Sequence, residues 1–555
     1  MSKLQQTYDY IIVGAGSAGC VLANRLSEDP HIQVLLLEAG PTDKGWIFEM
    51  PSALGELFEK PQFNWNYNSE PEPYLNGRII GQPRGRVLGG SSSTNGMVFI
   101  RGHAYDYDRW AEQGCDGWSY AEVLPYFQRS ETYDRGADDY HGNKGHLHIT
   151  SGAAQNPICQ AFIQAGIDAG YQASSDFNGY KQEGFGRMDR TTRKGCRWST
   201  ARGYLKEAIW RDNLCVETET LVTKVVFKGK RATGIQYIRN KQFYEVNAAQ
   251  EVILSGGAIN SPQTLLLSGV GPAVELRTHK IPVVHDLSGV GKNLNDHPDI
   301  VMQFKCKKPV SIYPWTKWPR KALLGSQWFF NHSGLAASNH FEAGAFIRSR
   351  SGVKHPDLQL TLMPLALHPG SSEVIATHAF QIHIDLMRPT SLGEITLGSS
   401  DPADSPKIVF NYLETKRDIE DMRTSVHLMR EVMAQPAFEE LCGEEILPGP
   451  GIQDDKAIDA WIRETVVTGY HATSTCRMGP ESDDNCVVDS QLHVRGLENL
   501  RVIDASIMPD VVSGNTNAAA VMIGEKGSDL VLGKEPLPVS TAQVWNSPNW
   551  ETSQR

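Results

Sequence analysis

Two residues near the end of the chain, His471 and Asn515, have side chains suited to proton transfer at an oxygen atom. A neutral imidazole can accept a proton near neutral pH, and a carboxamide can hold an oxygen by hydrogen bonds. Both lie beside glycines or turn residues, and His471 directly follows Tyr470. Taken alone, the histidine is more simply a buried core residue and the asparagine a helix cap. Their chemistry therefore depends on what the rest of the chain places around them.

The stretch from Tyr8 to Gly40 is arranged to bind a dinucleotide, because it predicts a strand, a glycine-rich turn, a helix and a second strand. Gly14 allows a tight exit from the strand, Gly16 lets a pyrophosphate approach bare backbone, and Gly19 lets the helix lie against the sheet. The N-terminus of the helix then faces the phosphates. Glu38, at the end of the second strand, is placed to accept the ribose hydroxyls.

A second glycine-rich loop, GRVLGGSSSTNG, occupies residues 85 to 96. It exposes backbone that can wrap a second set of phosphate or ring contacts, and Asn95 follows within reach. The alternative is a flexible serine linker. We favour the binding loop because an apolar strand, Met97 to Ile100, follows at once.

The secondary-structure pattern predicts an α/β protein, α+β overall, with a discontinuous nucleotide domain. Strand-rich segments return after long excursions, and we expect Ser261 to cap a helix that carries Pro262 in its first turn. Alternating strands over Leu358–Met363 and Phe380–Leu386 predict a second sheet covered on one face. We expect 1–155, 191–297 and 466–540 to bind the cofactor, 156–190 and 298–465 the substrate, and 541–555 to form a tail.

Composition sets limits on partners and location. A chain of 555 residues with net charge −11 and no long charge runs argues against nucleic-acid binding. The 9 cysteines show no CxxC pair, so we expect reduced thiols and no metal site. We see neither a leader pattern nor an apolar run that spans a bilayer. The expectation is a cytoplasmic protein, with peripheral attachment to the inner face of the cell membrane left open.

Six ordered motifs across nearly the whole chain resemble the glucose-methanol-choline (GMC) flavoprotein oxidoreductases. They are GAGSAG with Glu38, GRVLGGSSSTNG, GAINSPQTLLLSGVG, VGKNLNDHP, HATSTCRMG and DASIMPDVVSGNTN. The resemblance implies FAD in a Rossmann-like domain, held without a covalent bond, because Thr94 stands where some members carry a flavin-linked histidine. The cofactor residues it implies are Gly14, Gly16, Ser17, Ala18, Gly19, Glu38, Ala39, Arg86, Gly89, Gly90, Ser91, Asn95, Gly96, Met97, Val98, Val222, Gly257, Asp504, Ala505, Asn515 and Thr516.

Stretches outside the cofactor motifs, such as GLAASNHFEAGAFIRSR, resemble the choline-oxidising branch of this family. That implies oxidation of a primary alcohol, choline to betaine aldehyde, with a hydride passed to flavin N5. His471 would take the hydroxyl proton and Asn515 would hold the oxygen. The other hypotheses are an enzyme for aliphatic or aromatic primary alcohols and, more remotely, a hydroxynitrile lyase. The electron acceptor would be a quinone of the respiratory chain or oxygen.

A quaternary ammonium group is bound by aromatic faces and a carboxylate, so we expect such residues in the substrate wall. Glu342 is the candidate anion, with Tyr470, Trp65 and Trp315, or else Trp318, as aromatic walls. Glu342 could equally form a surface salt bridge with Arg348. The two later tryptophans lie between prolines and could instead pack a loop or touch a membrane.

Overall fold

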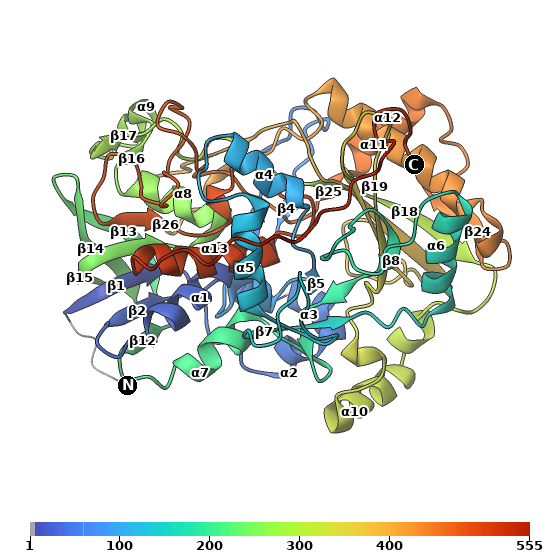
Figure 1. The fold of residues 1–555 in the computed structure, drawn as a ribbon, viewed down its shortest axis with the longest axis horizontal. Coiled ribbons are helices and arrows are strands. Elements are labelled where there is room, and N and C mark those ends of the chain that lie inside the picture. The colour runs from blue at the N-terminus through green and yellow to red at the C-terminus, as the bar shows by residue number, and fades with distance from the viewer. Residues whose placement is uncertain (1–5, 59) are drawn as a thin grey trace.

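The computed structural model describes residues 6–58 and 60–555, which fold around two large sheets (Figure 1). One sheet contains β1 (Thr7–Val13), and the other contains β18 (Pro298–Cys306) at the opposite end of the long axis. Each sheet carries its own main cluster of buried apolar side chains. The predicted fold class, a Rossmann-like domain joined to an antiparallel-sheet domain, is confirmed.

The first sheet has a parallel centre. β1 lies between β2 (Val34–Leu37) and β15 (Gln242–Leu254) and is parallel to both. β12 (Leu214–Glu217) continues the sheet beside β2, and β26 (Leu500–Val502) pairs with β15. The residues of β2 are all buried, as expected for a parallel strand covered on both faces. The carboxyl ends of β1 and β2 therefore meet at one edge, where the glycine-rich turn begins.

An antiparallel hairpin extends this sheet, and three helices pack together beside it. β13 (Leu221–Lys228) and β14 (Arg231–Arg239) extend the sheet beyond β15. α1 (Ser17–Leu26) packs against α13 (Asn517–Val531), which also contacts α5 (Tyr120–Ser130). The first and last long helices of the chain thus lie side by side, and their N-termini approach the same edge of the sheet (Figure 1).

The second sheet is antiparallel in all its described pairings. α6 (Pro157–Asp168) packs on its β8 and β19 side, and α11 (Lys416–Met433) contacts β21. β8 comes from the earlier excursion of the chain and pairs with β19 at the edge. The order along the sheet is β24 (Cys442–Leu447), β18, β21 (Ala379–Leu386), β20 (Leu358–Met363), β19 (Ala343–Ile347) and β8 (Gly184–Arg187), with β25 (Val467–Thr468) also paired to β18.

The other helices and strands pack around the two sheets or between them. The helices among them are α2 (Trp46–Glu49), α3 (Leu54–Phe58), α4 (Ala104–Glu112), α7 (Lys206–Ala208), α9 (Ala273–Thr278), α10 (Arg320–Asn331) and α12 (Asp455–Thr465). The strands are β3 (Tyr67–Asn68), β4 (Gly81–Gln82), β5 (Val98–Phe99), β6 (Glu131–Tyr133), β7 (Leu147–Ser151), β9 (Asp189–Arg190), β10 (Thr192–Arg193), β11 (Cys196–Arg197), β16 (Val270–Gly271), β17 (His285–Asp286), β22 (Glu394–Thr396) and β23 (Lys407–Val409). Among the helices in the described part of the chain, none combines the length and apolar composition needed to span a bilayer.

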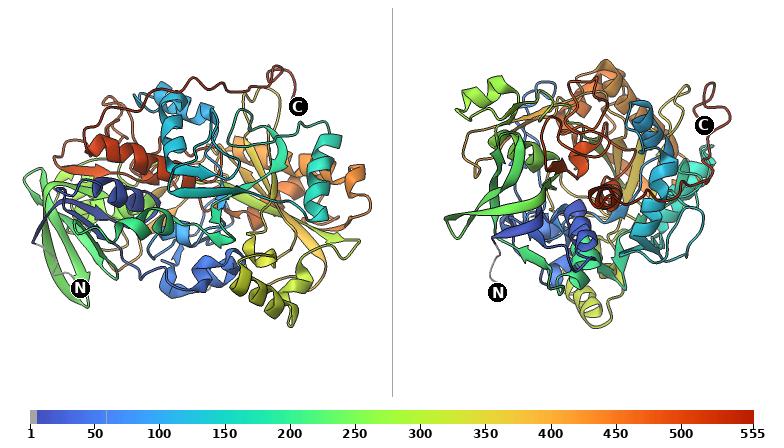
Figure 2. Two further views of the ribbon diagram at one scale, coloured as in Figure 1. Left: turned by 60° about the horizontal axis from the view of Figure 1, so that its bottom comes forward. Right: turned by 60° about the vertical axis from the view of Figure 1, so that its left-hand side comes forward.

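The C-terminal tail runs along the outside of the molecule from α13 to the second sheet domain (Figure 2). Its backbone bonds to both halves: Ser540 N donates to Ala121 O at 2.8 Å, and Trp545 N donates to Tyr180 O at 2.9 Å. Farther along, Arg348 Nη1 donates to Ser553 O at 2.7 Å. The tail is thus held to the body of the protein by specific hydrogen bonds.

Candidate active site

A cavity of about 1600 Å³ is lined by residues from both sheets. Its lining includes Val13 at the end of β1, Asp299 on β18 and Gln381 on β21. A cavity of this size exceeds that of an ordinary small-ligand pocket and can hold a dinucleotide together with a small substrate. We describe it from the nucleotide end toward the second sheet.

The glycine-rich turn after β1 has positions where a side chain would clash with neighbouring backbone. Gly14 has φ of +100°, and a Cβ there would lie 2.5 Å from Ser255 O. A Cβ on Gly19 would lie 2.0 Å from Gly14 O, so only glycine lets α1 start this close to the strand. A Cβ on Gly16 would meet nothing nearer than Ser255 O at 3.9 Å, because this residue faces the cavity. The open space at Gly16 is where a phosphate could approach the backbone.

Glu38 lies at the end of β2 with its carboxylate inside the cavity wall. It accepts hydrogen bonds from Ala15 N at 3.0 Å and from Gly40 N at 2.8 Å. Burial raises the pKa of Glu38 to about 7, although these backbone N–H groups oppose the shift. The carboxylate therefore joins the phosphate loop to the end of β2 and still reaches the cavity.

The second glycine-rich loop lies directly on the first. Gly90 has φ of +52°, and a Cβ there would lie 2.8 Å from Gly16 Cα. Asn95 Oδ1 accepts from Met97 N at 3.0 Å and from Arg197 Nη1 at 3.0 Å, which fixes the carboxamide. The two loops together form one continuous backbone surface on the cavity.

Most of the predicted cofactor residues line this cavity. They are Gly14, Gly16, Ser17, Ala18, Glu38, Ala39, Gly90, Ser91, Asn95, Gly96, Met97, Val98, Val222, Gly257, Asp504, Ala505, Asn515 and Thr516. Gly19, Arg86 and Gly89 are not among the lining residues. Arg86 instead places its guanidinium over the ring of Trp65, 4.9 Å from the centroid.

Asp504 joins the end of β26 to the start of α8 (Gly257–Leu267). Its Oδ2 accepts from Gly257 N at 2.8 Å and from Ser261 Oγ at 2.5 Å. The predicted cap at Ser261 is wrong, because α8 begins one turn earlier at Gly257 and the serine hydroxyl serves Asp504 instead. Burial raises the pKa of Asp504, opposed by these hydrogen bonds.

His471 and Asn515, far apart in the chain, meet at the cavity. Asn515 Nδ2 lies 2.9 Å from His471 Nε2, and His471 Nδ1 lies 2.9 Å from His297 Nδ1. With Asn515 donating to Nε2, the proton on His471 is at Nδ1 and is donated to His297. Burial, then the neighbouring His297 and Arg84, lower the pKa of His471 well below its ordinary value. The imidazole is therefore neutral and presents a lone pair at Nε2.

Sequence reasoning missed two residues that hold His471, although both lie in the VGKNLNDHP motif. His297 orients the ring as described. Asp296 Oδ1 accepts from the His471 backbone N–H at 2.7 Å, and its Oδ2 accepts from Thr468 Oγ1 at 2.6 Å. Because both lie in one family motif, a role in the site could have been expected. Nothing in the sequence, however, links that motif to His471.

The predicted substrate residues divide into two groups. Tyr470, 43% exposed, lines the cavity together with Trp65 and Trp315, whereas Trp318 is 83% exposed and lies outside the lining. Glu342 is not among the lining residues either. Its carboxylate is bound by Arg190 Nη1 at 2.6 Å, Ser338 Oγ at 2.7 Å and Ala154 N at 2.9 Å. The predicted salt bridge with Arg348 is wrong, because Arg348 pairs with Glu183 instead.

Two acids that the sequence analysis did not single out face the cavity instead. Asp299 on β18 and Asp385 on β21 are directly opposite in the sheet, and both line the cavity. The available signal was an acid at a polar position of a strand that alternates apolar and polar residues, as in Phe380–Leu386. The two acids lie together only because of the register between β18 and β21, which are distant in sequence.

Comparisons with family models and with known sequences point to the same protein family. Family models described as GMC oxidoreductase match residues 8–299 and 389–524. A mitochondrial choline dehydrogenase of Mus musculus is 48% identical over 552 residues, covering 98% of this chain and 93% of the relative. An oxygen-dependent choline dehydrogenase of Pseudomonas putida is 48% identical over 549 residues, covering 98% and 97%.

Solved structures with a similar fold include two oxidases. Pyridoxine 4-oxidase from Mesorbium loti matches with a TM-score of 0.87 at 30% identity, covering 95% of this chain and 100% of that chain. A formate oxidase matches with a TM-score of 0.89 at 25% identity, covering 96% and 99%. With family models spanning most of the chain and relatives of nearly half identity along its length, the chain belongs to the GMC oxidoreductase family.

Proposed function

We propose that this protein binds FAD and oxidises a primary alcohol to the aldehyde, with choline as the substrate. The observation that carries the proposal is the His471–Asn515 pair, with 2.9 Å between Nε2 and Nδ2, at a cavity that also contains a dinucleotide-binding loop. The nearly full-length relatives named choline dehydrogenase support choline, because they match 98% of this chain at 48% identity. The product would be betaine aldehyde, on the route to glycine betaine.

The residues at the nucleotide end fit FAD. Gly16 and the first turn of α1, Ser17 and Ala18, would hold the phosphates on backbone N–H groups, and Glu38 would accept the adenosine ribose hydroxyls. The N-terminus of α13, which carries Thr516 and Asn517 into the cavity, would face the pyrimidine end of the flavin. Thr94 supplies no covalent link, so the cofactor would be released intact on unfolding.

When bound, FAD supplies a hydride acceptor. The chain's own residues prepare the alcohol for that transfer, because hydride leaves readily only from a carbon whose oxygen gains negative charge. The substrate hydroxyl would contact both His471 Nε2 and Asn515 Nδ2 in place of their hydrogen bond to each other, giving its proton to the first and accepting from the second. His297 accepts from His471 Nδ1, so the ring keeps the tautomer in which Nε2 is unprotonated.

Domain roles follow the same division. We assign FAD to 1–155, 191–297 and 466–540, and the substrate to 156–190 and 298–465, with 541–555 as the tail. The site lies where these parts meet, since His471 belongs to the first set and Asp385 to the second. Substrate access would then depend on the short elements between the sheets.

We further propose that electrons pass to a quinone at a membrane surface. Trp318, Leu323 and Phe330 are exposed at and before α10, with Phe330 84% exposed, and Arg320 and Lys321 lie beside them. Apolar tips flanked by cations suit an anionic bilayer. Cosedimentation with phosphatidylglycerol vesicles should exceed that with phosphatidylcholine vesicles and should fall in Trp318→Ser/Phe330→Ser. Equal binding by the variant would exclude this surface.

The function is tested by anaerobic reduction of the bound flavin with a panel of alcohols. We expect choline to bleach the flavin faster than hexanol or benzyl alcohol at equal concentration. Strong preference for a neutral alcohol would favour the aliphatic or aromatic alternative. A flavin that stays oxidised with every alcohol would contradict redox function and favour a lyase.

A further inference from the structure

We propose that Asp385, together with Asp299, forms the subsite that binds the quaternary ammonium group of the substrate. This inference rests on the proposed function and moves the anionic subsite away from Glu342. It starts from the second sheet. β18 and β21 pair antiparallel, and Asp299 is the direct partner of Asp385. Direct partners in an antiparallel pair project from the same face of the sheet.

The two faces of this strand pair differ in composition. On one face, Ile300, Met302 and Phe304 of β18 and their neighbours on β21 belong to the apolar core. On the other face, the cavity is lined by Asp299, Val301, Gln303, Gln381, His383 and Asp385. A polar strip inside a buried sheet has a cost unless its groups are paired or bind a ligand.

Most groups in this strip have partners. Asp299 Oδ2 lies 2.7 Å from His383 Nδ1, and its Oδ1 accepts from Ile384 N at 3.2 Å. Although burial opposes it, Asp299 raises the pKa of His383. His383 Nε2 in turn lies 2.8 Å from Gln381 Nε2. These residues form a chain of contacts that ends at the sheet's cavity face.

Asp385 is the exception. It is only 6% exposed, and no residue in the described part of the chain makes a hydrogen bond or ion pair with its carboxyl. Burial, then the charges of Asp299 and Asp296, raise its pKa well above the ordinary value. A buried carboxyl among other acids lacks a cation, and a cationic ligand in the cavity would supply one.

The carboxyl lies at the correct place relative to the base. A Cβ built on Gly469 would be 2.7 Å from Asp385 Oδ1 and 3.1 Å from His471 Nδ1, so both groups flank one glycine. Tyr470, which follows that glycine, also lines the cavity and offers an aromatic face to a cation. A ligand with an ammonium group two carbons from a hydroxyl could reach both Asp385 and the His471–Asn515 pair.

Glu342 is less suited to this role. Its carboxylate already has a cation, a hydroxyl and a backbone N–H as partners, and it lies outside the cavity lining. Although burial opposes it, the Ser338 hydrogen bond and the Arg190 charge lower its pKa. Glu342 therefore holds Arg190 and the loop at Ala154.

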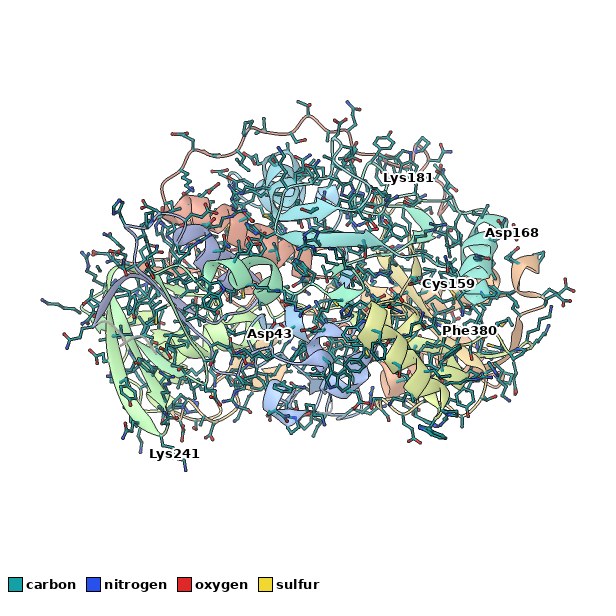
Figure 3. The ribbon with its side chains drawn as sticks, turned by 90° about the horizontal axis from the view of Figure 1, so that it is seen from below. Asp43, Cys159, Asp168, Lys181, Lys241 and Phe380 are labelled. Atoms are coloured by element: carbon teal, nitrogen blue, oxygen red, sulfur yellow. The ribbon has the colours of Figure 1, made fainter. Side chains whose placement is uncertain are left out.

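The test compares a cation with its neutral isostere in the FAD-loaded enzyme. Asp385→Asn keeps the side-chain shape and removes the charge. We expect kcat/KM for choline to fall on the order of 100-fold, through KM. For 3,3-dimethylbutan-1-ol, the carbon isostere of choline, we expect a change within about threefold. Asp168→Asn is the control, because Asp168 is an exposed acid at the end of α6, at the outer edge of the molecule (Figure 3).

A second measurement separates this inference from the proposed function. Tetramethylammonium should inhibit flavin reduction by a neutral alcohol, and Asp385→Asn should weaken that inhibition at least tenfold. If wild type ignores choline but the variant loses this inhibition, the proposed function fails and the subsite stands. If the variant keeps choline KM and the inhibition while Glu342→Gln loses both, the subsite is at Glu342 and the inference is wrong.

Discussion

At the scale of single residues, the site is organised by hydrogen bonds that fix the tautomer of His471, so that its unprotonated Nε2 can accept a proton. His471 Nδ1 is engaged by His297 and its backbone N–H by Asp296, which holds the ring and its backbone in position. Nε2 faces Asn515 and the cavity. Burial and the neighbouring His297 and Arg84 lower the pKa of His471 and keep its imidazole neutral.

The lowered pKa of His471 sets the pH dependence of the chemical step. A histidine whose pKa is below its ordinary 6.5 keeps the neutral form, which is the base, as pH falls through 6.5. The limiting rate of flavin reduction at saturating choline should therefore stay constant down to pH 6.5 and decline only in more acidic buffer. Stopped-flow reduction across a pH series checks this. A rate that is already halved at pH 6.5 would contradict it.

At the scale of elements, the two glycine-rich loops act as one unit because their backbones touch. Gly90→Ala would drive its Cβ toward Gly16 Cα, 2.8 Å away, and separate the loops. We expect the FAD dissociation constant to rise about tenfold or more, equivalent to about 1.4 kcal/mol. The flavin-to-protein ratio after dilution measures this.

Gly229→Ala is the matched control for that variant. Gly229 also has a positive φ, +64°, but nothing lies within 4 Å of its Cβ position. It therefore carries the same kind of backbone strain without the contact. Equal loss of FAD in both variants would show that strain, not loop contact, is responsible.

The elements also show which features sequence patterns could predict. The βαβ unit was predictable because its signals are local: apolar strands, spaced glycines and an acid at the end of the second strand. The second sheet was predictable from strand alternation. The start of α8 was not, since Ser261 is used by Asp504 from a distant strand. Strand register places Asp385 opposite Asp299, and Arg190, which binds Glu342, comes from another segment of the chain. Neither relation is local in sequence, so the sequence pointed to Glu342 and not to Asp385.

At the scale of the whole molecule, the tail joins parts that are distant in sequence. Arg348 is 1% exposed, and its guanidinium donates to Ser553 O and to Ser547 Oγ, at 3.2 Å, in the tail. Deleting residues 541–555 would leave these donors without partners, at a cost of about 1–3 kcal/mol. We expect a lower Tm by calorimetry and a nearly unchanged rate of flavin reduction, because the tail does not line the cavity.

Glu431→Gln is the control for the deletion. Its ion pair with Arg555 is partly exposed on both sides and should contribute little to stability. If the deletion leaves Tm at the wild-type value, or lowers it no more than this control, the tail has no structural role.

The central claim is that His471 takes the alcohol proton at a site shared by both sheets. The most direct measurement is the rate of anaerobic flavin reduction by choline in wild type, His471→Ala and the surface control His427→Ala, each with FAD content matched. We predict that His471→Ala lowers the rate by a factor on the order of 100 or more while FAD stays bound, and that the control matches wild type. A His471→Ala rate close to wild type would contradict the account.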